Sequence, residues 1–312
     1  MPVQSKKIEF DKMVASGNDF IVIDNRDGKI RNAKALAQHV CPFHTSIGAD
    51  GILLLEKSKK AAFKMRIVNS DGSEAEACGN GFRCIALYAH KRLKLPKNFK
   101  FESLSGIIEA HISGARVKVQ LAKPHSYQDR RILEVQGNRL HYSFMNTGVP
   151  HAVILTEGLS EVDVLKLGRS VREHSVFKPA GTNVNFVEIQ GLHDIHVRTY
   201  ERGVENETLA CGTGSTASAL ITSLAGYTKS PVRVRTSGGE ILTIDFKSKG
   251  SEILEVTLEG EVRFVFEGVL NLSAYAEDAA LKLRMNALDG PRRSLGGEGG
   301  SHSASARFRR NI

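Results

Sequence analysis

The sequence predicts an α+β fold made of two related halves, each with mostly antiparallel strands. The length of 312 residues is enough for two domains of about 130 residues each, followed by a tail. Short apolar runs typical of strands accompany one long helical segment in each half. A glycine-rich motif, E-x-x-A-C-G-x-G, occurs at 74–81 and again at 207–214. These three observations together favour a duplicated α+β unit.

The two copies of this motif extend beyond the glycines. Each continues to an Ala-Leu pair, Ala86-Leu87 in the first copy and Ala219-Leu220 in the second. Over fourteen aligned positions the copies share seven residues, which chance rarely produces at fixed spacing. We therefore interpret them as a duplication in which each half presents one cysteine at the start of a helix.

The first half is read from its apolar runs and its polar turns. Phe20–Ile23 is a continuous strand-like run, and Ile85, Tyr88, Ala89 and Leu93 recur at helical spacing. Ser16–Asp19 and the stretch 69–74 are turn signals, and Pro96 ends the long helix. We expect two strands within 8–24, a helix over Ala33–Val40, strands at Ile52–Leu55 and 62–68, a helix over Gly79–Leu93, and strands at Gly106–His111 and Ala115–Leu121.

The second half begins after a crossover that we expect at 122–128. Ser160-x-x-Asp163 has the spacing of a helix N-cap, which predicts a helix extending to about Glu173. Beyond Gly290 the chain consists mainly of Gly, Ser and Arg, which cannot bury enough apolar surface to fold. We expect strands at Leu140–Phe144, Ala152–Leu155, 181–186 and Ile195–Tyr200, a helix over Thr213–Leu224, strands up to Phe266, an amphipathic helix over Ala274–Leu288, and a mobile basic tail over 271–312.

The amino-acid composition argues against several classes of function. The net charge of +9 indicates a general preference for anionic ligands, but the chain has no Trp, so a nucleic-acid partner is not favoured. No apolar run approaches the roughly 18 residues of a membrane span, and no secretory signal is evident, so we expect a cytoplasmic protein. The four cysteines form no CxxC pair, which disfavours a zinc site. A disulfide framework is not expected in a chain of this length without a secretory signal. Reactive thiols are the better interpretation, and we expect no bound metal.

Two cysteines at helix starts suit proton transfer at a carbon atom. A helix N-terminus lowers a cysteine pKa, and its free N–H groups bind an anion. Two such helices converging on one carboxylate would flank the adjacent α-carbon with a thiolate on one face and a thiol on the other. Cys78 and Cys211 would then invert the configuration at that carbon without a cofactor. His151 and Glu201 are reasonable proton partners, provided that the fold brings them close.

Simpler interpretations remain for each residue. A C-G-x-G stretch also fits a tight turn around a buried thiol, although two matched copies argue against this. Asn18 lies in a turn that needs no ligand, and an isolated histidine such as His151 is commonly structural. Cys41 and Cys84 are interpreted as core thiols. The glycines do not match G-x-G-x-x-G, so a dinucleotide site is not predicted.

The ordered motifs resemble the diaminopimelate epimerase family, whose members interconvert LL- and meso-diaminopimelate without a cofactor. The resemblance covers residues 8–268. Each motif is weak alone, but their order is specific. They are GNDF (17–20), IGADG (47–51), NSDGSEAEACGNGFRC (69–84), PH (150–151), GTNVNF (181–186), YERG (200–203) and ETLACGTG (207–214).

This resemblance implies a fold and a set of site residues. It implies two pseudo-symmetric halves, each with a mostly antiparallel, barrel-like sheet wrapped around a central helix. One half would comprise residues 1–122, completed by a returning strand at about 261–270, and the other residues 123–260. A homodimer acting in lysine and peptidoglycan synthesis is also implied. The implied catalytic residues are Cys78, Cys211, His151 and Glu201, and the implied substrate-binding residues are Asn18, Asn69, Gly79, Asn80, Asn183, Glu201, Arg202, Gly212 and Thr213.

The chain departs from the family pattern at several positions. Val149 stands where many members have Asn, Gly51 where several have Gln, and Phe43 where Arg is common. These differences leave the cysteines untouched and concern the far end of the substrate. A racemase of another amino acid, such as histidine or glutamate, and a non-catalytic anion-binding or redox-sensing relative are therefore the alternatives.

Overall fold

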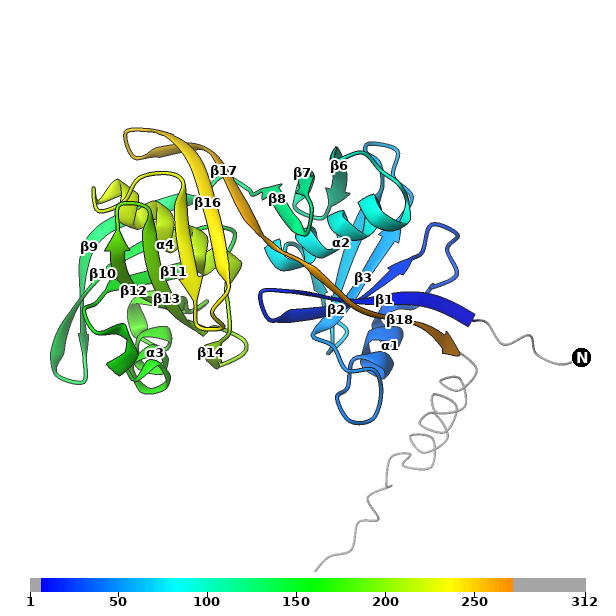
Figure 1. Cartoon of the computed structure of the whole chain (residues 1–312). Helices are drawn as coiled ribbons and strands as arrows, with labels where there is room; N and C mark the ends of the chain where they lie inside the picture. The colour runs from blue at the N-terminus through cyan, green and yellow to red at the C-terminus, as the bar shows by residue number, and fades with distance from the viewer. Residues whose placement is uncertain (1–6, 272–312) are drawn as a thin grey trace, which may run out of the picture. The chain divides into compact units, whose positions relative to one another are not determined.

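The computed structural model describes residues 7–271. Within that range the chain is a mixed α+β fold with four α-helices, and its eighteen strands join one large mixed sheet (Figure 1). None of the helices described is long and apolar enough to cross a membrane. The amphipathic helix expected over 274–288 and the basic tail lie outside the described residues, apart from Asn271.

The N-terminal part of the chain contains α2, the helix that follows Cys78. This helix is buried along most of its length and contacts strands β1, β2, β3, β7 and β8. The expected helix over Ala33–Val40 is confirmed with the same bounds, whereas β6 was not predicted. The elements are β1 (Lys7–Ala15), β2 (Asn18–Asp24), α1 (Ala33–Val40), β3 (Gly51–Glu56), β4 (Lys64–Asn69), β5 (Glu74–Ala75), α2 (Gly79–Arg92), β6 (Asn98–Ser103), β7 (Gly106–Ser113) and β8 (Arg116–Gln120).

The C-terminal part of the described chain contains α4, the helix that follows Cys211. It is also largely buried, and it contacts β10 to β13, β15 and β16. The elements are β9 (His125–Val135), β10 (Asn138–Asn146), β11 (Pro150–Leu155), a 3₁₀ turn (Leu159–Glu161), α3 (Val164–Arg172), a second 3₁₀ turn (Ser175–Phe177), β12 (Asn183–Gly191), β13 (Asp194–Glu201), β14 (Asn206–Thr208), α4 (Gly212–Leu224), β15 (Val232–Thr236), β16 (Ile241–Lys249), β17 (Glu252–Glu261) and β18 (Arg263–Asn271).

Two local predictions are wrong. Ser160 lies inside a 3₁₀ turn, and Asp163 caps α3 instead, its Oδ1 accepting the Lys166 N–H at 3.0 Å. Both residue types favour N-caps, so the sequence pattern did not distinguish them. The crossover expected over 122–128 is shorter, because β9 already begins at His125.

Strand β17 hydrogen-bonds to β16 on one side and to β8 on the other. Leu258 is paired with Ile244 of β16 on one side and with Val119 of β8 on the other, both antiparallel. The next strand, β18, pairs with β1, so the end of the described chain returns to its beginning (Figure 1). Because β17 belongs to both sets of pairings, its side chains lie where the surroundings of α2 and α4 meet.

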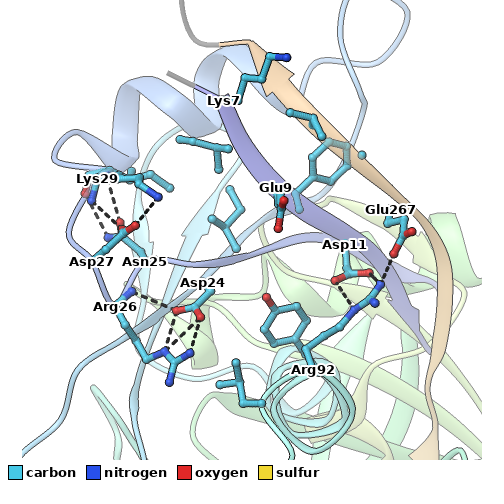
Figure 2. A pocket seen from close by; sticks show the side chains of 18 of the residues that line it. Lys7, Glu9, Asp11, Asp24, Asn25, Arg26, Asp27, Lys29, Arg92 and Glu267 are labelled. Carbon is cyan, nitrogen blue, oxygen red and sulfur yellow. Dashed lines mark hydrogen bonds and ion pairs between the residues drawn. The ribbon is translucent and has the colours of Figure 1, made fainter. Parts of the chain in front are cut away.

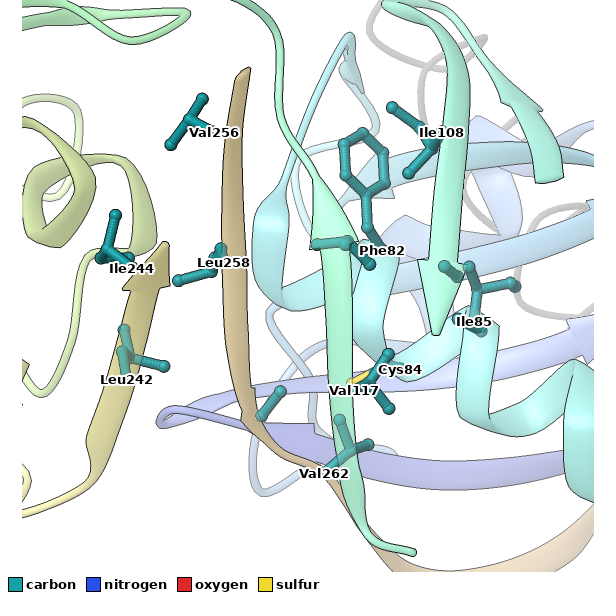
Figure 3. Packing of buried hydrophobic residues seen from close by; sticks show 14 of the residues in the cluster. Phe82, Cys84, Ile85, Ile108, Val117, Leu242, Ile244, Val256, Leu258 and Val262 are labelled. Atoms are coloured by element: carbon teal, nitrogen blue, oxygen red, sulfur yellow. The ribbon is translucent and has the colours of Figure 1, made fainter. Parts of the chain in front are cut away.

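One apolar cluster runs through this region. It joins Cys84 of α2 and Val117 of β8 to Leu242 of β16 and Leu258 of β17, all fully buried (Figure 3). Cys84 and Cys41 are buried, as predicted for core thiols. The two cysteine-bearing helices are therefore supported by shared packing.

Candidate active site

Cys78 and Cys211 occupy the same position in their helices. Each is the N-cap residue in extended backbone conformation, with φ −152° and ψ 110° for Cys78 and φ −120° and ψ 110° for Cys211. Each sulfur accepts the backbone N–H of the residue three positions on, Gly81 or Gly214, at 3.4 Å in both cases. The sulfurs thus take the place that a Ser or Asp oxygen holds in an ordinary N-cap.

The two helix starts converge on a single side chain. A β-carbon added to Gly79 would lie 2.8 Å from Cδ2 of Leu258, and one added to Gly212 would lie 3.1 Å from the same atom. The Asn80 Oδ1 is 3.6 Å from that second position. Leu258 therefore packs beneath both helix N-termini, and a β-carbon at either glycine would require the Leu258 side chain to shift.

The ionisation of the thiols differs from the prediction. The pKa of Cys211 is raised to about 12, chiefly by burial and then by the Glu201 carboxylate, against hydrogen bonds from Thr213 and Gly214. Burial also raises the pKa of Cys78, against N–H groups of its own helix start. The desolvation of a thiolate thus outweighs the helix N–H groups, and both cysteines are thiols at neutral pH in this structure.

A polar network orients the first cysteine loop. Asn80 donates from Nδ2 to Asn18 Oδ1 at 2.5 Å, and Asn18 donates in turn to Asp50 Oδ2 at 2.9 Å. Both ends of the Asn18 amide are therefore engaged by protein groups. Asn69, at the end of β4, is the register partner of Gly51 on β3 and donates to Ser73 Oγ at 3.0 Å. Asp50 organises this corner and was not predicted.

Arg83 lies beneath the same loop and was also not predicted. It is fully buried, and its Nη2 donates to Asn80 Oδ1 at 2.5 Å and to Ser16 Oγ at 2.7 Å. Burial lowers its pKa. The residue lies within the GNGFRC motif, so its position was visible in the sequence although its role was not.

Strands β11 and β12 and the end of β13 bring His151, Asn183 and Arg202 together. His151 and Asn183 are register partners on the parallel strands β11 and β12. Asn183 donates to the Pro150 carbonyl at 3.1 Å and accepts the Arg202 backbone N–H at 2.8 Å. The pKa of His151 is lowered to about 3, chiefly by burial and then by the Arg202 charge, so the imidazole is neutral.

Glu201 ends β13 and connects the two cysteine regions electrostatically. Its Oε2 accepts the Thr208 hydroxyl at 2.9 Å, and burial, assisted by Asp50, raises its pKa. It acts on both thiols, raising the pKa of each. A carboxylate with a raised pKa close to two thiols is a suitable proton acceptor.

A separate cavity lies away from the cysteines. It has a volume of about 1250 Å³ and is lined by β1, the end of β2, the end of α2 and β18. Figure 2 shows its charged side chains in pairs of opposite sign, Arg92 with Asp11 and Glu267 and Arg26 with Asp24. It contains none of the predicted site residues. In residues 7–271 no group of His, Cys, Asp and Glu has the arrangement of a metal site.

The fold has known counterparts among amino-acid isomerases and related proteins. A hydroxyproline epimerase from Agrobacterium vitis superposes with a TM-score of 0.66 at 13% identity, covering 86% of this chain and 94% of that one. A phenazine biosynthesis protein of the PhzF family from Bacillus anthracis gives a TM-score of 0.66 at 15% identity, covering 85% of this chain and 99% of that one. At this identity the likeness concerns the fold alone.

Sequence similarity identifies the family. The model of the diaminopimelate epimerase family matches residues 10–126 and 143–265. The diaminopimelate epimerase of Aquifex aeolicus is 47% identical over 277 residues, covering 85% of this chain and 98% of that protein. That of Hydrogenobaculum sp. is 43% identical over 278 residues, covering 85% and 99%. The chain belongs to the diaminopimelate epimerase family, as its motifs predicted.

Proposed function

We propose that this protein converts LL-diaminopimelate to meso-diaminopimelate by two-base epimerisation without pyridoxal phosphate, an isomerase step in lysine and peptidoglycan synthesis. The observation that carries the proposal is the pair of N-cap cysteines whose helix starts meet at Leu258. Family membership supports the choice of substrate. Two thiols on converging helix N-termini suit a carbon atom bearing a carboxylate.

The pKa shifts of the site residues indicate which groups carry protons before the substrate binds. Both cysteines have raised pKa values, so a thiolate must form when the substrate binds. The ammonium group of a bound amino acid supplies positive charge that lowers the pKa of a nearby thiol. Glu201, with its raised pKa, accepts the thiol proton. Glu201 thus assists Cys78 and Cys211 as a proton acceptor, and His151, a neutral imidazole, assists them without taking up that proton.

The inversion itself then needs only the two sulfurs. One thiolate removes the α-proton and becomes a thiol, and the electron pair of the broken C–H bond stays on the α-carbon. The opposite thiol donates its proton to the other face and becomes a thiolate. Protons and charges balance. Proton exchange with solvent then restores the starting ionisation, and the two cysteines exchange roles only when the reaction runs in reverse.

Substrate binding is assigned to two groups of residues. The backbone N–H groups around Gly79, Asn80, Gly212 and Thr213 hold the carboxylate next to the reacting carbon. The second amino-acid head of diaminopimelate needs fixed donors and acceptors, and an arginine fork suits its carboxylate. We assign that end to Asn18, Asn69, Asn183, Glu201 and Arg202.

The finer architecture and assembly are part of the proposal. We assign one barrel-like half around α2 to residues 1–122, completed by the strand at 261–270, and a pseudo-symmetric half around α4 to residues 123–260. We place the enzyme in the cytoplasm, where thiols stay reduced.

We also propose that the protein forms a homodimer. This is supported by three exposed apolar side chains on β18, those of Val265, Phe266 and Val269. Light scattering on the full chain tests the dimer.

The substrate is tested by direct comparison of amino acids. Purified protein under reducing conditions is incubated separately with LL-diaminopimelate, L-histidine and L-glutamate, and the stereoisomers are resolved by chiral chromatography. We expect meso-diaminopimelate only. Racemisation of histidine or glutamate without diaminopimelate turnover would assign the site to another amino acid, and no turnover of any of them would favour a non-catalytic relative.

A further inference from the structure

One ring nitrogen of His151 has a hydrogen-bond partner and the other has none among the described residues. His151 lies on β11 with 0% of its surface exposed. Its Nδ1 is 3.2 Å from Nδ2 of Asn185, whereas its Nε2 is buried with no hydrogen-bond partner among the described residues. A buried ring nitrogen without a partner is costly in a folded protein. The unpartnered Nε2 therefore requires an explanation.

The orientation of the Asn185 amide decides which nitrogen carries the proton. Asn185 lies on β12, two residues beyond Asn183, and is itself fully buried. Its Oδ1 accepts the Thr199 hydroxyl at 3.0 Å, and its Nδ2 donates to the Ala152 carbonyl at 3.1 Å. With the amide reversed, its oxygen would face that carbonyl. The NH₂ group is therefore the side turned toward His151, where it donates to Nδ1.

We propose that Asn185 is a positioning residue that holds His151 as the neutral Nε2–H tautomer, so that His151 donates a hydrogen bond to an anion in the active site and does not act as a base toward the thiols. The proposal deepens the function assigned above and rests on it for the identity of the anion. A neutral imidazole whose Nδ1 already accepts a hydrogen bond has no free lone pair for a thiol proton. The lowered pKa of His151 agrees with this neutral form.

Gly214 contacts both the Asn185 amide and the second cysteine. Its N–H donates to the Cys211 sulfur at 3.4 Å, and a β-carbon added to it would overlap Oδ1 of Asn185. The amide of Asn185 is therefore held between the start of α4 and the imidazole. The corresponding glycine of the first half, Gly81, faces the ends of the Met65 and Leu53 side chains instead. Of the two cysteine-bearing helix starts, only that of Cys211 has this contact between a glycine and the amide that faces His151.

In this proposal His151 and Glu201 have different roles, one as a hydrogen-bond donor and the other as a proton acceptor. Glu201 carries a raised pKa and exchanges protons with the thiols. His151 offers one fixed N–H in a buried setting, where such a donor stabilises negative charge strongly. The acceptor is an anion, either the substrate carboxylate or a cysteine thiolate.

The tautomer is measured directly by NMR on the full chain labelled with ¹⁵N-histidine. Long-range proton–nitrogen correlations distinguish the two neutral tautomers and the cation, and the spectrum of His151→Gln identifies the signals of His151. We expect a neutral Nε2–H imidazole at pH 7 without substrate. A protonated Nδ1, or a cation at pH 7, would overturn the proposal. This readout needs no activity, so it stands apart from the choice of substrate.

Two variants test the role of Asn185. In Asn185→Asp the group facing Nδ1 becomes an acceptor, so we expect the Nδ1–H form and a kcat lower by roughly 10²-fold or more, with a smaller change in KM. Thr199→Val removes the donor that orients the amide and should shift the tautomer in the same direction by less. Unfolding curves verify the fold of both variants. Unchanged tautomer and kcat in folded Asn185→Asp or, should that variant not fold, in Thr199→Val would refute the proposal.

Two titrations identify the anion. Addition of LL-diaminopimelate at pH 7 should move the His151 Nε2–H signal if the acceptor is the carboxylate. Raising the pH without substrate should move it if the acceptor is a thiolate, and Cys211→Ala should abolish that second response. A signal that moves in neither titration would contradict the donor role.

Discussion

Replacing Leu258 with alanine should impair catalysis beyond its effect on stability. The side chain is fully buried within the apolar cluster (Figure 3). Its Cδ2 also packs against the starts of both α2 and α4. Truncation of a buried leucine costs about 2–5 kcal/mol of unfolding free energy. It also removes the side chain against which Gly79 and Gly212 both pack, so we expect the spacing of the two sulfurs to change. A displacement of about 1 Å at reacting groups can cost on the order of 10²-fold in rate.

Leu242→Ala is the matched control. Leu242 is also fully buried in the same cluster, but it packs against Gly260 and not against the two helix starts. Urea unfolding should give similar losses of stability for both variants. The rate of meso-diaminopimelate formation at saturating substrate should fall by about 10²-fold more in Leu258→Ala. Equal kcat values in the two variants would refute the view that Leu258 sets the spacing of the thiols.

Three further outcomes follow from particular residues. In Gly260→Ala the new methyl group would overlap Nη1 of Arg83, so the unfolding free energy should fall by about 1–3 kcal/mol, whereas Gly191→Ala, with open space around it, should stay near neutral in the same urea titration. The pKa of His151 is about 3 in the folded state against an ordinary 6.5, so the unfolded state alone takes up this proton and stability should fall as the pH drops from about 6.5 to 3. That loss amounts to about 4–5 kcal/mol, and a His151→Gln variant with an equally steep acid slope would contradict it. The pKa of Cys211 is about 12, so stability should also fall as the pH rises from about 8.5 toward 12, with a shallower slope in Cys211→Ala.

Local sequence signals predicted the elements that carry the thiols. The apolar spacing and the C-G-x-G turns placed α2 and α4 within one residue of their observed starts or ends. The helix before Glu173 was predicted to begin too early, because Ser160 and Asp163 are both good caps and only tertiary packing selects between them. Strand β9 escaped prediction because most of its residues are exposed, so its apolar alternation is weak.

The contacts that hold the site together could not be predicted from the sequence. Arg83 and Asn185 lie in motifs that were already visible, but their hydrogen bonds run to residues distant in the chain. Leu258 has no local signal, since its role arises where β17 meets both helix starts. The thiol pKa was predicted in the wrong direction because helix termini are a local property, whereas burial depends on the whole fold.

The central claim is that Cys78 and Cys211 transfer protons on opposite faces of one carbon. The direct measurement is epimerisation of LL-diaminopimelate in deuterated water by the wild type, Cys78→Ala and Cys211→Ala, followed by chiral separation and mass spectrometry. The wild type should form meso-diaminopimelate with one solvent deuterium at the inverted carbon. Each alanine variant, verified as folded, should form none. Formation of meso-diaminopimelate by either variant at the wild-type rate would contradict the two-thiol mechanism.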